Sequence, residues 1–212
     1  MALSKFTDTL IKGFQTSPAG AAAHHAVALR INNAIDVFDA LNADKSRPKS
    51  EKAVMYKQLQ DQHGGDIRKS LARFHDDLSA RADNLAQAAD KALTSVSMAE
   101  AVQIVVGLKQ AGLSADAIRA TIADSKEIAV AMARVPSALS GFEPEVATRA
   151  ALKHFPELVA DEDAIRRDLS AYQSLERVVA KTIMEIGMNV GEQALAARFD
   201  PSRLNPTTES AE

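Results

Sequence analysis

The histidines offer the widest chemistry in this chain, since an imidazole can accept a proton, bind a metal or orient a nucleophile. Two of the five are adjacent, His24 and His25, but neighbouring helical residues point about 100° apart and cannot chelate one ion together. No HExxH or ExxH pair adds a ligand at helical spacing. His154 lies near an expected helix end and has no identifiable nucleophile beside it. We therefore expect no metal and no cofactor.

Other catalytic signatures are missing as well. The chain contains no cysteine, which excludes disulfides and thiolate chemistry, and no GxSxG or GxGxxG motif. The pair Gly64 and Gly65 could cradle a phosphate, but Asp66 places a negative charge at the following helix start, so we interpret the glycines as a hinge or tight turn. We expect no catalytic residue and no enzymatic activity.

The segment LKQAGLSADAIRATI, around Gly112, resembles the turn of a helix-turn-helix. Its second helix would carry Asp116 and Asp124 with Arg119 as its basic residue, a poor surface to lay against phosphates. The net charge of −3 also lacks the basic excess typical of nucleic-acid binders. A plain helical hairpin explains the same residues, so contact with nucleic acid is the alternative interpretation.

The composition predicts an all-α protein. Alanine is the most frequent residue, and the chain has only 9 glycines, 7 prolines and no tryptophan. Alanine loses no side-chain entropy in a helix, whereas glycine and proline interrupt one. We expect an elongated helical bundle with two long helices, at about 66–98 and 162–199, and several shorter ones.

The first long helix, at about 66–98, carries an apolar stripe that repeats every eleven residues, which keeps a nearly straight helix dry on one side. Alanines occupy the two positions of the stripe that lack a large apolar side chain. Arginines, lysines and aspartates cover the opposite side of the helix. We take its large members as candidates for packing or for an interface: Ile67, Leu71, Phe74, Leu78, Leu85, Leu93 and Val96.

The second long helix should open at Asp161, since acidic residues favour a helix N-terminus. An apolar row recurs every seven residues, and Leu169 and Leu175 widen it. Two glycines four residues apart indicate a close helix contact or a bend. The candidates for packing or for an interface here are Ile165, Tyr172, Val179, Ile186, Gly187 and Gly191.

Shorter helices are expected on either side of these. Amphipathic spacing predicts a helix at 3–15, which could touch a membrane surface weakly. It also predicts a helix that begins at a cap at Ser50 and ends at Gln62. The other expected helices lie at 21–42, 99–111, 115–135 and 145–154. Gly112 should end one helix and Ser114 cap the next. We expect an N-terminal helical part at 1–97, a short-helix subdomain at 98–160, the long helix at 161–199 and a polar tail at 200–212.

The function expected from these features is structural. Two long helices, each about 50 Å by the helical rise, leave more apolar stripe than the shorter helices can cover. We therefore predict a non-enzymatic assembly protein whose copies associate through amphipathic helices in a coiled-coil-like manner, as a homo-oligomer or larger assembly. We extend this to an internal, scaffolding or connector component of a phage virion, although no motif carries that choice. With no secretory signal and no long apolar run, we expect a cytoplasmic or virion location.

Overall fold

The computed structural model describes residues 15–198 of the 212, with only the backbone at 189, 190 and 192–198. This part of the chain forms eight helices and no strand, which confirms the all-α class. The expected helix at 3–15 and the tail at 200–212 lie essentially outside the described residues. The helices are α2 (Pro18–Ala43), α3 (Lys49–Leu93), α4 (Met98–Gln110), α5 (Ala115–Asp124), α6 (Lys126–Arg134), α7 (Ser137–Ser140), α8 (Pro144–Leu152) and α9 (Pro156–Arg198).

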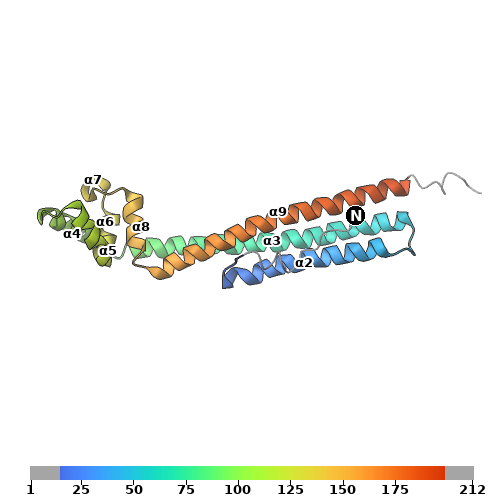
Figure 1. Cartoon of the computed structure of the whole chain (residues 1–212), viewed down its shortest axis with the longest axis horizontal. Coiled ribbons are helices and arrows are strands. Elements are labelled where there is room, and N and C mark those ends of the chain that lie inside the picture. Colours follow the sequence, from blue (N-terminus) through green and yellow to red (C-terminus); the bar gives the residue numbers. More distant parts are fainter. Residues whose placement is uncertain (1–14, 199–212) are drawn as a thin grey trace, which may run out of the picture. The chain divides into compact units, whose positions relative to one another are not determined.

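The chain divides into two compact units, and the division runs through both long helices, α3 and α9. Both helices are labelled in Figure 1. The first unit comprises residues 1–77 and 167–212, and the second comprises residues 78–166. Helix α2 belongs wholly to the first unit and α4 to α8 wholly to the second, while α3 and α9 contribute to both. The sequence had placed its boundaries at the ends of the long helices, near 97 and 160.

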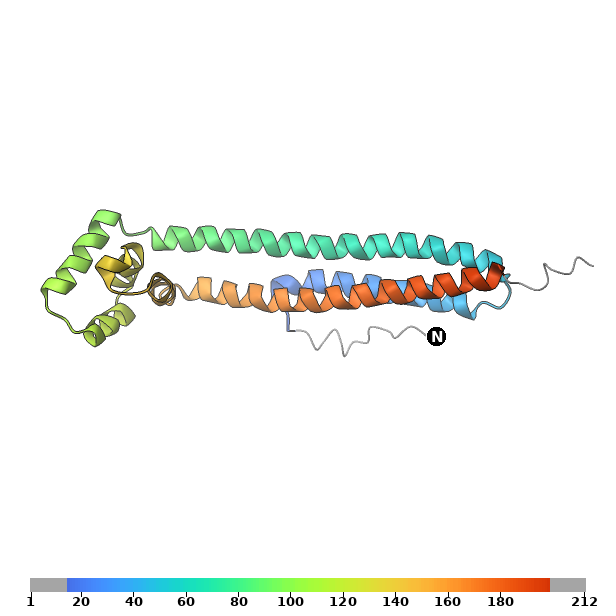
Figure 2. The ribbon, with the colours of Figure 1, turned by 90° about the horizontal axis from the view of Figure 1, so that it is seen from above.

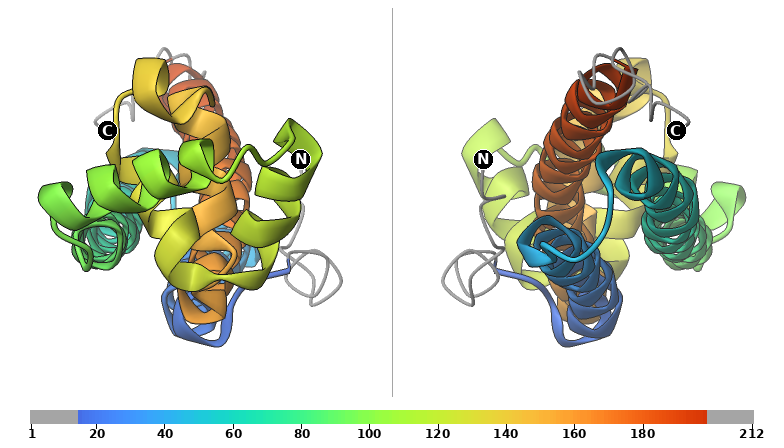
Figure 3. Two further views of the ribbon diagram at one scale, coloured as in Figure 1. Left: turned by 90° about the vertical axis from the view of Figure 1, so that its left-hand side faces the viewer. Right: turned by 90° about the vertical axis from the view of Figure 1, so that its right-hand side faces the viewer.

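The first unit is a bundle of α2 and the adjoining parts of α3 and α9, which lie side by side in Figure 2 and in the right-hand view of Figure 3. Aromatic rings join the helices in pairs. The rings of Phe38 on α2 and Tyr56 on α3 are 4.8 Å apart, and those of Phe74 on α3 and Tyr172 on α9 are 5.9 Å apart. The buried residues of α2 gather on one face of the helix, as packing on one side requires: Gly20, His24, Val27, Ala28, Ile31, Ala34, Ile35, Phe38 and Leu41.

Helix α3 is unbroken from Lys49 to Leu93, so the predicted hinge at Gly64 and Gly65 and the predicted cap at Ser50 are wrong. Two glycines cost a helix about 2 kcal/mol relative to alanine. Burial of large side chains on both sides of them, Tyr56 and Ile67, outweighs that cost, because each contributes about 1.5–3 kcal/mol.

Helix α9 also begins earlier than predicted, at Pro156 instead of Asp161. Proline suits the first turn of a helix because its missing N–H would have no partner there. The expected helix at 145–154 stops just before Pro156, and this proline opens α9. Glu157 supplies the acidic side chain in the first turn.

The second unit is built around α6, whose residues Ala129 to Met132 are all buried. The short helices of this unit face the viewer in the left-hand view of Figure 3. Helices α4 and α8 pack against it through Ala101, Val105 and Ala151. Val96 belongs to this core too, but it lies in the turn after α3, so its assignment to the long helix is wrong. Four consecutive buried residues show that α6 is covered on every side of this stretch.

The predicted helix at 115–135 is two helices, because Ser125 breaks it. Ser125 has extended backbone angles, its N–H bonds to the Thr121 carbonyl, and its side chain accepts from Ile128 N. The turn before it matches the prediction: Gly112 follows the α4 cap with a φ of 66°, and the Ser114 side chain accepts from Ala117 N at 3.2 Å. These two expectations are confirmed.

Replacing Gly65 by alanine should stabilise the protein by about 0.5–1 kcal/mol, because a mid-helix glycine is entropically costly and a Cβ there would have no neighbour within 4 Å. The matched variant Gly112→Ala should lose about 1 kcal/mol, since its left-handed backbone disfavours a side chain. Urea unfolding followed by circular dichroism measures both. A loss of stability in Gly65→Ala would mean that α3 is not continuous there.

Candidate interaction surface

The inner face of α9 follows two rows with seven-residue spacing. One is the predicted row, in which Val179 and Ile186 are buried and Ile165 and Tyr172 are half-buried. The other, three residues further along, consists of Asp168, Leu175 and Thr182, all buried. Leu169, which was expected to widen the stripe, is 44% exposed instead. The inner face therefore contains two polar residues that the apolar pattern did not show.

The predicted stripe of α3 divides between the two units. Ile67 and Phe74 are buried in the first unit, with Leu71 half-buried beside them. Leu78 is buried at the start of the second unit, and Leu85 and Leu93 are only half-buried there. The stripe is thus least covered within the second unit.

The two glycines of α9 differ in their surroundings. A Cβ on Gly187 would lie 3.0 Å from the Nε2 atom of Gln60, so α3 approaches closely at this point. A Cβ on Gly191 would have no described neighbour within 4 Å. The expected close contact therefore exists at Gly187 and is not found at Gly191 among the described residues.

A buried polar cluster joins the start of α2 to α9. The Asp168 side chain is 0% exposed and accepts hydrogen bonds from Ser17 N at 2.6 Å and from Ser17 Oγ at 2.5 Å. Ser17 Oγ also accepts from Gly20 N at 3.1 Å and so caps α2. A carboxylate at a helix N-terminus is favoured by the helix dipole. Asp168 therefore fixes where α2 begins against α9.

His24, one turn into α2, is the titratable group beside this cluster and is 3% exposed. Burial lowers the pKa of its imidazole below the ordinary value of 6.5, and His25 lowers it further, while the negative charge of Asp168 opposes both effects. The folded protein consequently favours the neutral imidazole at this position.

The clearest open surface is an apolar hollow of about 320 Å³ within the second unit. Ala82, Leu85 and Ala89 line it from α3, and Leu158, Val159, Glu162 and Ile165 line it from α9; Ala86 and Leu152 complete the lining. Helix α2 contributes nothing to it. We call this surface the open seam.

A second hollow, of about 350 Å³, shares Leu85 and Ile165 with the open seam and is more polar. Its lining adds Arg81, Asn84 and Ala88 from α3 and Asp161 from α9. Two predicted stripe residues therefore border a hollow that presents both charge signs. Such a surface can bind an apolar helix face with polar groups at its margin.

The described residues also constrain metal and membrane sites. Within 15–198, no three His, Asp or Glu side chains gather closely enough to hold a metal ion. No single described helix has both the length and the apolar character needed to cross a bilayer. The bent pair α3 and α4, at 58°, passes that test together. Ala101 and Val105 of α4 are core residues of the second unit, which accounts for its apolar character.

Comparisons of the chain with protein-family models, with curated proteins and with solved structures gave no match. The fold class and the surfaces described above are therefore the basis for the functional argument.

The cluster formed by Ser17, Gly20 and Asp168 was not predicted from the sequence. The expected helix at 21–42 begins after Ser17 and Gly20, and no prediction joined these residues to α9. The available signal was the seven-residue spacing of Asp168, Leu175 and Thr182, which runs parallel to the apolar row. A polar residue at a buried position of such a row typically fixes the register between packed helices.

Gly20→Ala should destabilise the protein by about 1–3 kcal/mol, since a Cβ there would overlap the Asp168 carboxylate. The same substitution in an Asp168→Ala background should cost much less, because the overlapping group is gone. Urea unfolding of the four members of this cycle gives the coupling. Equal costs in both backgrounds would show that Gly20 and Asp168 do not meet.

His24 should make stability depend on pH. Its folded pKa is lowered, so the unfolded chain binds more protons between that pKa and 6.5, and stability rises with pH in this window. Unfolding midpoints measured from about pH 8 down to about pH 5.5 should therefore fall as the pH drops below 6.5. His24→Asn should flatten this dependence, and His25→Asn, an exposed neighbour, should retain most of it. An unchanged profile in His24→Asn would contradict the assignment.

Proposed function

We propose that this chain is a non-enzymatic assembly protein whose copies associate through the open seam. The observation that carries the proposal is that α3 and α9 border an apolar hollow and an adjoining, more polar one within the second unit, where their shared face is least covered. In the first unit the corresponding face is occupied by α2. A second copy would supply a third helical layer to the second unit in the same manner.

The energetics favour such a contact. Leu85 and Ile165 are half-buried, so completing the burial of each contributes about half of the roughly 1.5–3 kcal/mol that full burial of a large apolar side chain gives. Val159, which is 37% exposed, and the alanines of α3 add apolar area and allow close helix approach. Stable interfaces cover about 800 Å² on each partner, so the contact must extend along both helices beyond the hollow itself.

Self-association fits the charges at the margin of the seam. Arg81 and Asp161 lie on facing helices and border the same hollow. In a two-fold contact each surface meets its own copy, and a margin that carries both signs is able to complement itself. A margin of one sign would repel a second copy.

The setting of the assembly is a further part of the proposal. An internal, scaffolding or connector layer of a phage virion would use a helical subunit of this kind, and this choice comes from the composition and helix pattern alone. The mass of the native particle and the proteins that co-purify with it would test it.

A helical regulator that contacts nucleic acid through the α4–α5 hairpin is the alternative. Its one basic side chain in α5, Arg119, is paired with Asp116 at 2.9 Å. The exposed face of α5 also carries Asp124. Acidic neighbours oppose contact with phosphates, so the hairpin supports this function less well than the open seam supports assembly.

Leu85→Asp should weaken self-association by at least about tenfold, because it places a charge in the apolar centre of the seam. Its effect on the fold should be small, since Leu85 is only half-buried. Sedimentation equilibrium over micromolar concentrations measures the association, and thermal unfolding monitors the fold. Leu169→Asp is the control, because Leu169 is an exposed leucine of α9 outside the seam.

A wild-type protein that sediments as a monomer throughout this range would overturn the proposal. The same holds if Leu169→Asp weakens association as much as Leu85→Asp, because the contact would then lie elsewhere.

A further inference from the structure

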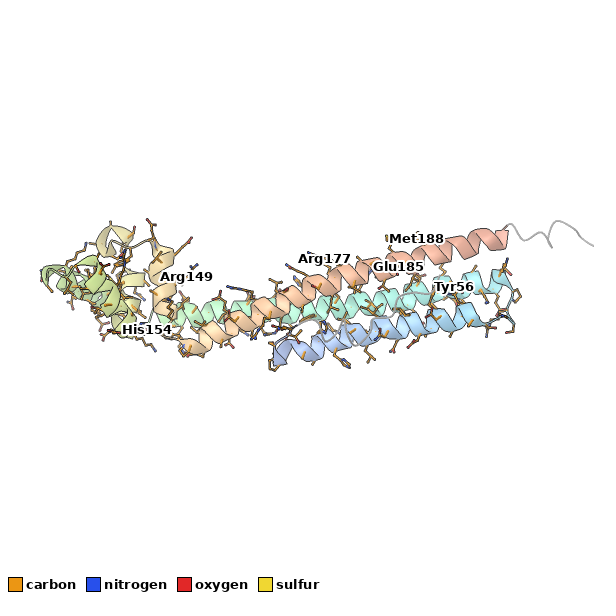
Figure 4. The ribbon with its side chains drawn as sticks, viewed as in Figure 1. Tyr56, Arg149, His154, Arg177, Glu185 and Met188 are labelled. Carbon is orange, nitrogen blue, oxygen red and sulfur yellow. The ribbon has the colours of Figure 1, made fainter. Side chains whose placement is uncertain are left out.

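A separate groove runs between α5 and α8 in the second unit, and His154, which lines it, is labelled in Figure 4. It consists of two adjoining hollows of about 360 Å³ and about 420 Å³, which share Arg119, Phe142 and Val146. Neither hollow includes a residue of the open seam. We call it the α5–α8 groove.

The walls of this groove are apolar helix faces. Ala115, Ile118 and Ile122 line it from α5 at spacings of three and four residues, and Val146 and Ala150 line it from α8. Ile122 and Ala147 are buried at its base. Val146 is 58% exposed, so a large apolar side chain faces solvent in the groove. The length of α5 and α8 gives the groove about 14 Å, or roughly two and a half helical turns.

One part of the groove is basic. The hollow between Ile122 and Ala150 is lined by Arg119, Lys153 and His154 and by no carboxylate. His154 is fixed in place, since its Nε2 lies 2.8 Å from the Ile122 carbonyl oxygen and must donate to it. Two acidic groups lie nearby: Asp116 pairs with Arg119, and Glu143 borders the other hollow. Lys153 is exposed and has no ion pair among those found in the described residues.

We propose that the α5–α8 groove binds an acidic amphipathic helix from a partner protein. An amphipathic helix of two to three turns matches the length of the groove and would cover Val146 and Phe142 with its apolar face. Acidic side chains along its margin would meet Lys153, which lines a hollow that contains no carboxylate.

A helix is the conformation that the walls favour. The backbone groups of α5 and α8 are bonded within those helices, so an extended peptide would find no strand edge to pair with. A helical ligand satisfies its own backbone groups and needs only side-chain contact.

The test uses the full chain and a fluorescein-labelled model peptide. The peptide is a helix of about fourteen residues, with leucines at i, i+3, i+4 and i+7 and glutamate and alanine elsewhere. Two controls are a peptide with lysine in place of glutamate and a scrambled peptide of the same composition. Fluorescence anisotropy at low and high salt should show tightest binding of the acidic helix, weakened by salt.

Val146→Asp should weaken binding of the acidic peptide by at least about tenfold. Val54→Asp is the matched control, because Val54 is equally exposed, at 58%, and lies on α3 outside the groove. Lys153→Glu should weaken binding and reduce its salt dependence, and Lys109→Glu, an exposed lysine of α4, should change neither. Circular dichroism checks that each variant is folded.

Three results would overturn the proposal. The acidic peptide could bind no more tightly than the lysine or scrambled peptide, or Val146→Asp could bind it as wild type does. The third is that Val146→Asp loses self-association while Leu85→Asp associates as the wild type does. That result would mean that a second copy of the chain occupies the groove. If sedimentation shows no self-association through the open seam, the expected binding of the peptide is unchanged. The two proposals are therefore tested independently.

Discussion

The difference in length between α2 and the two long helices is the constraint on which the account depends. Helix α2 has 26 residues, whereas α3 has 45 and α9 has 43. At about 1.5 Å per residue, α2 is too short to cover the whole apolar face that runs along α3 and α9. Within the first unit that face is buried by Phe38, Ile31 and their neighbours. In the second unit Leu85 and Ile165 remain half-exposed, and the proposed assembly follows from that imbalance.

Polar groups fix the register of α2 against α9 in the first unit. Asp168 is buried on α9 and receives two hydrogen bonds from Ser17, and Gly20 leaves the space that its carboxylate occupies. Burying a carboxylate is costly unless it is hydrogen-bonded, so a slipped α2 would leave it unsatisfied. Apolar stripes alone would allow α2 to slide along α9 by one repeat. The contact of Asp168 with Ser17 and Gly20 does not allow this. The cluster thereby places the start of α2, and with it the limit of what α2 covers.

The sequence predicted the fold class and many packing residues, because helical spacing is a property of the chain itself. Ile67, Phe74, Val179 and Ile186 are all buried as that spacing implies. It failed at Gly64 and Gly65, where packing overrides local propensity, and at Ser125, whose cap divides one expected helix into two. The open seam and the α5–α8 groove could not be located from the sequence, since each depends on which helices pack together.

The absence of cysteine from the chain allows the most direct measurement of the central claim. Leu85→Cys introduces a single thiol at the centre of the open seam, and mild oxidation links two copies only where their thiols approach within disulfide reach. The account predicts a covalent dimer from Leu85→Cys, formed faster than from Leu169→Cys and suppressed when Ile165→Asp is added. Equal rates of linkage at the two sites, or no dimer at Leu85, would contradict it.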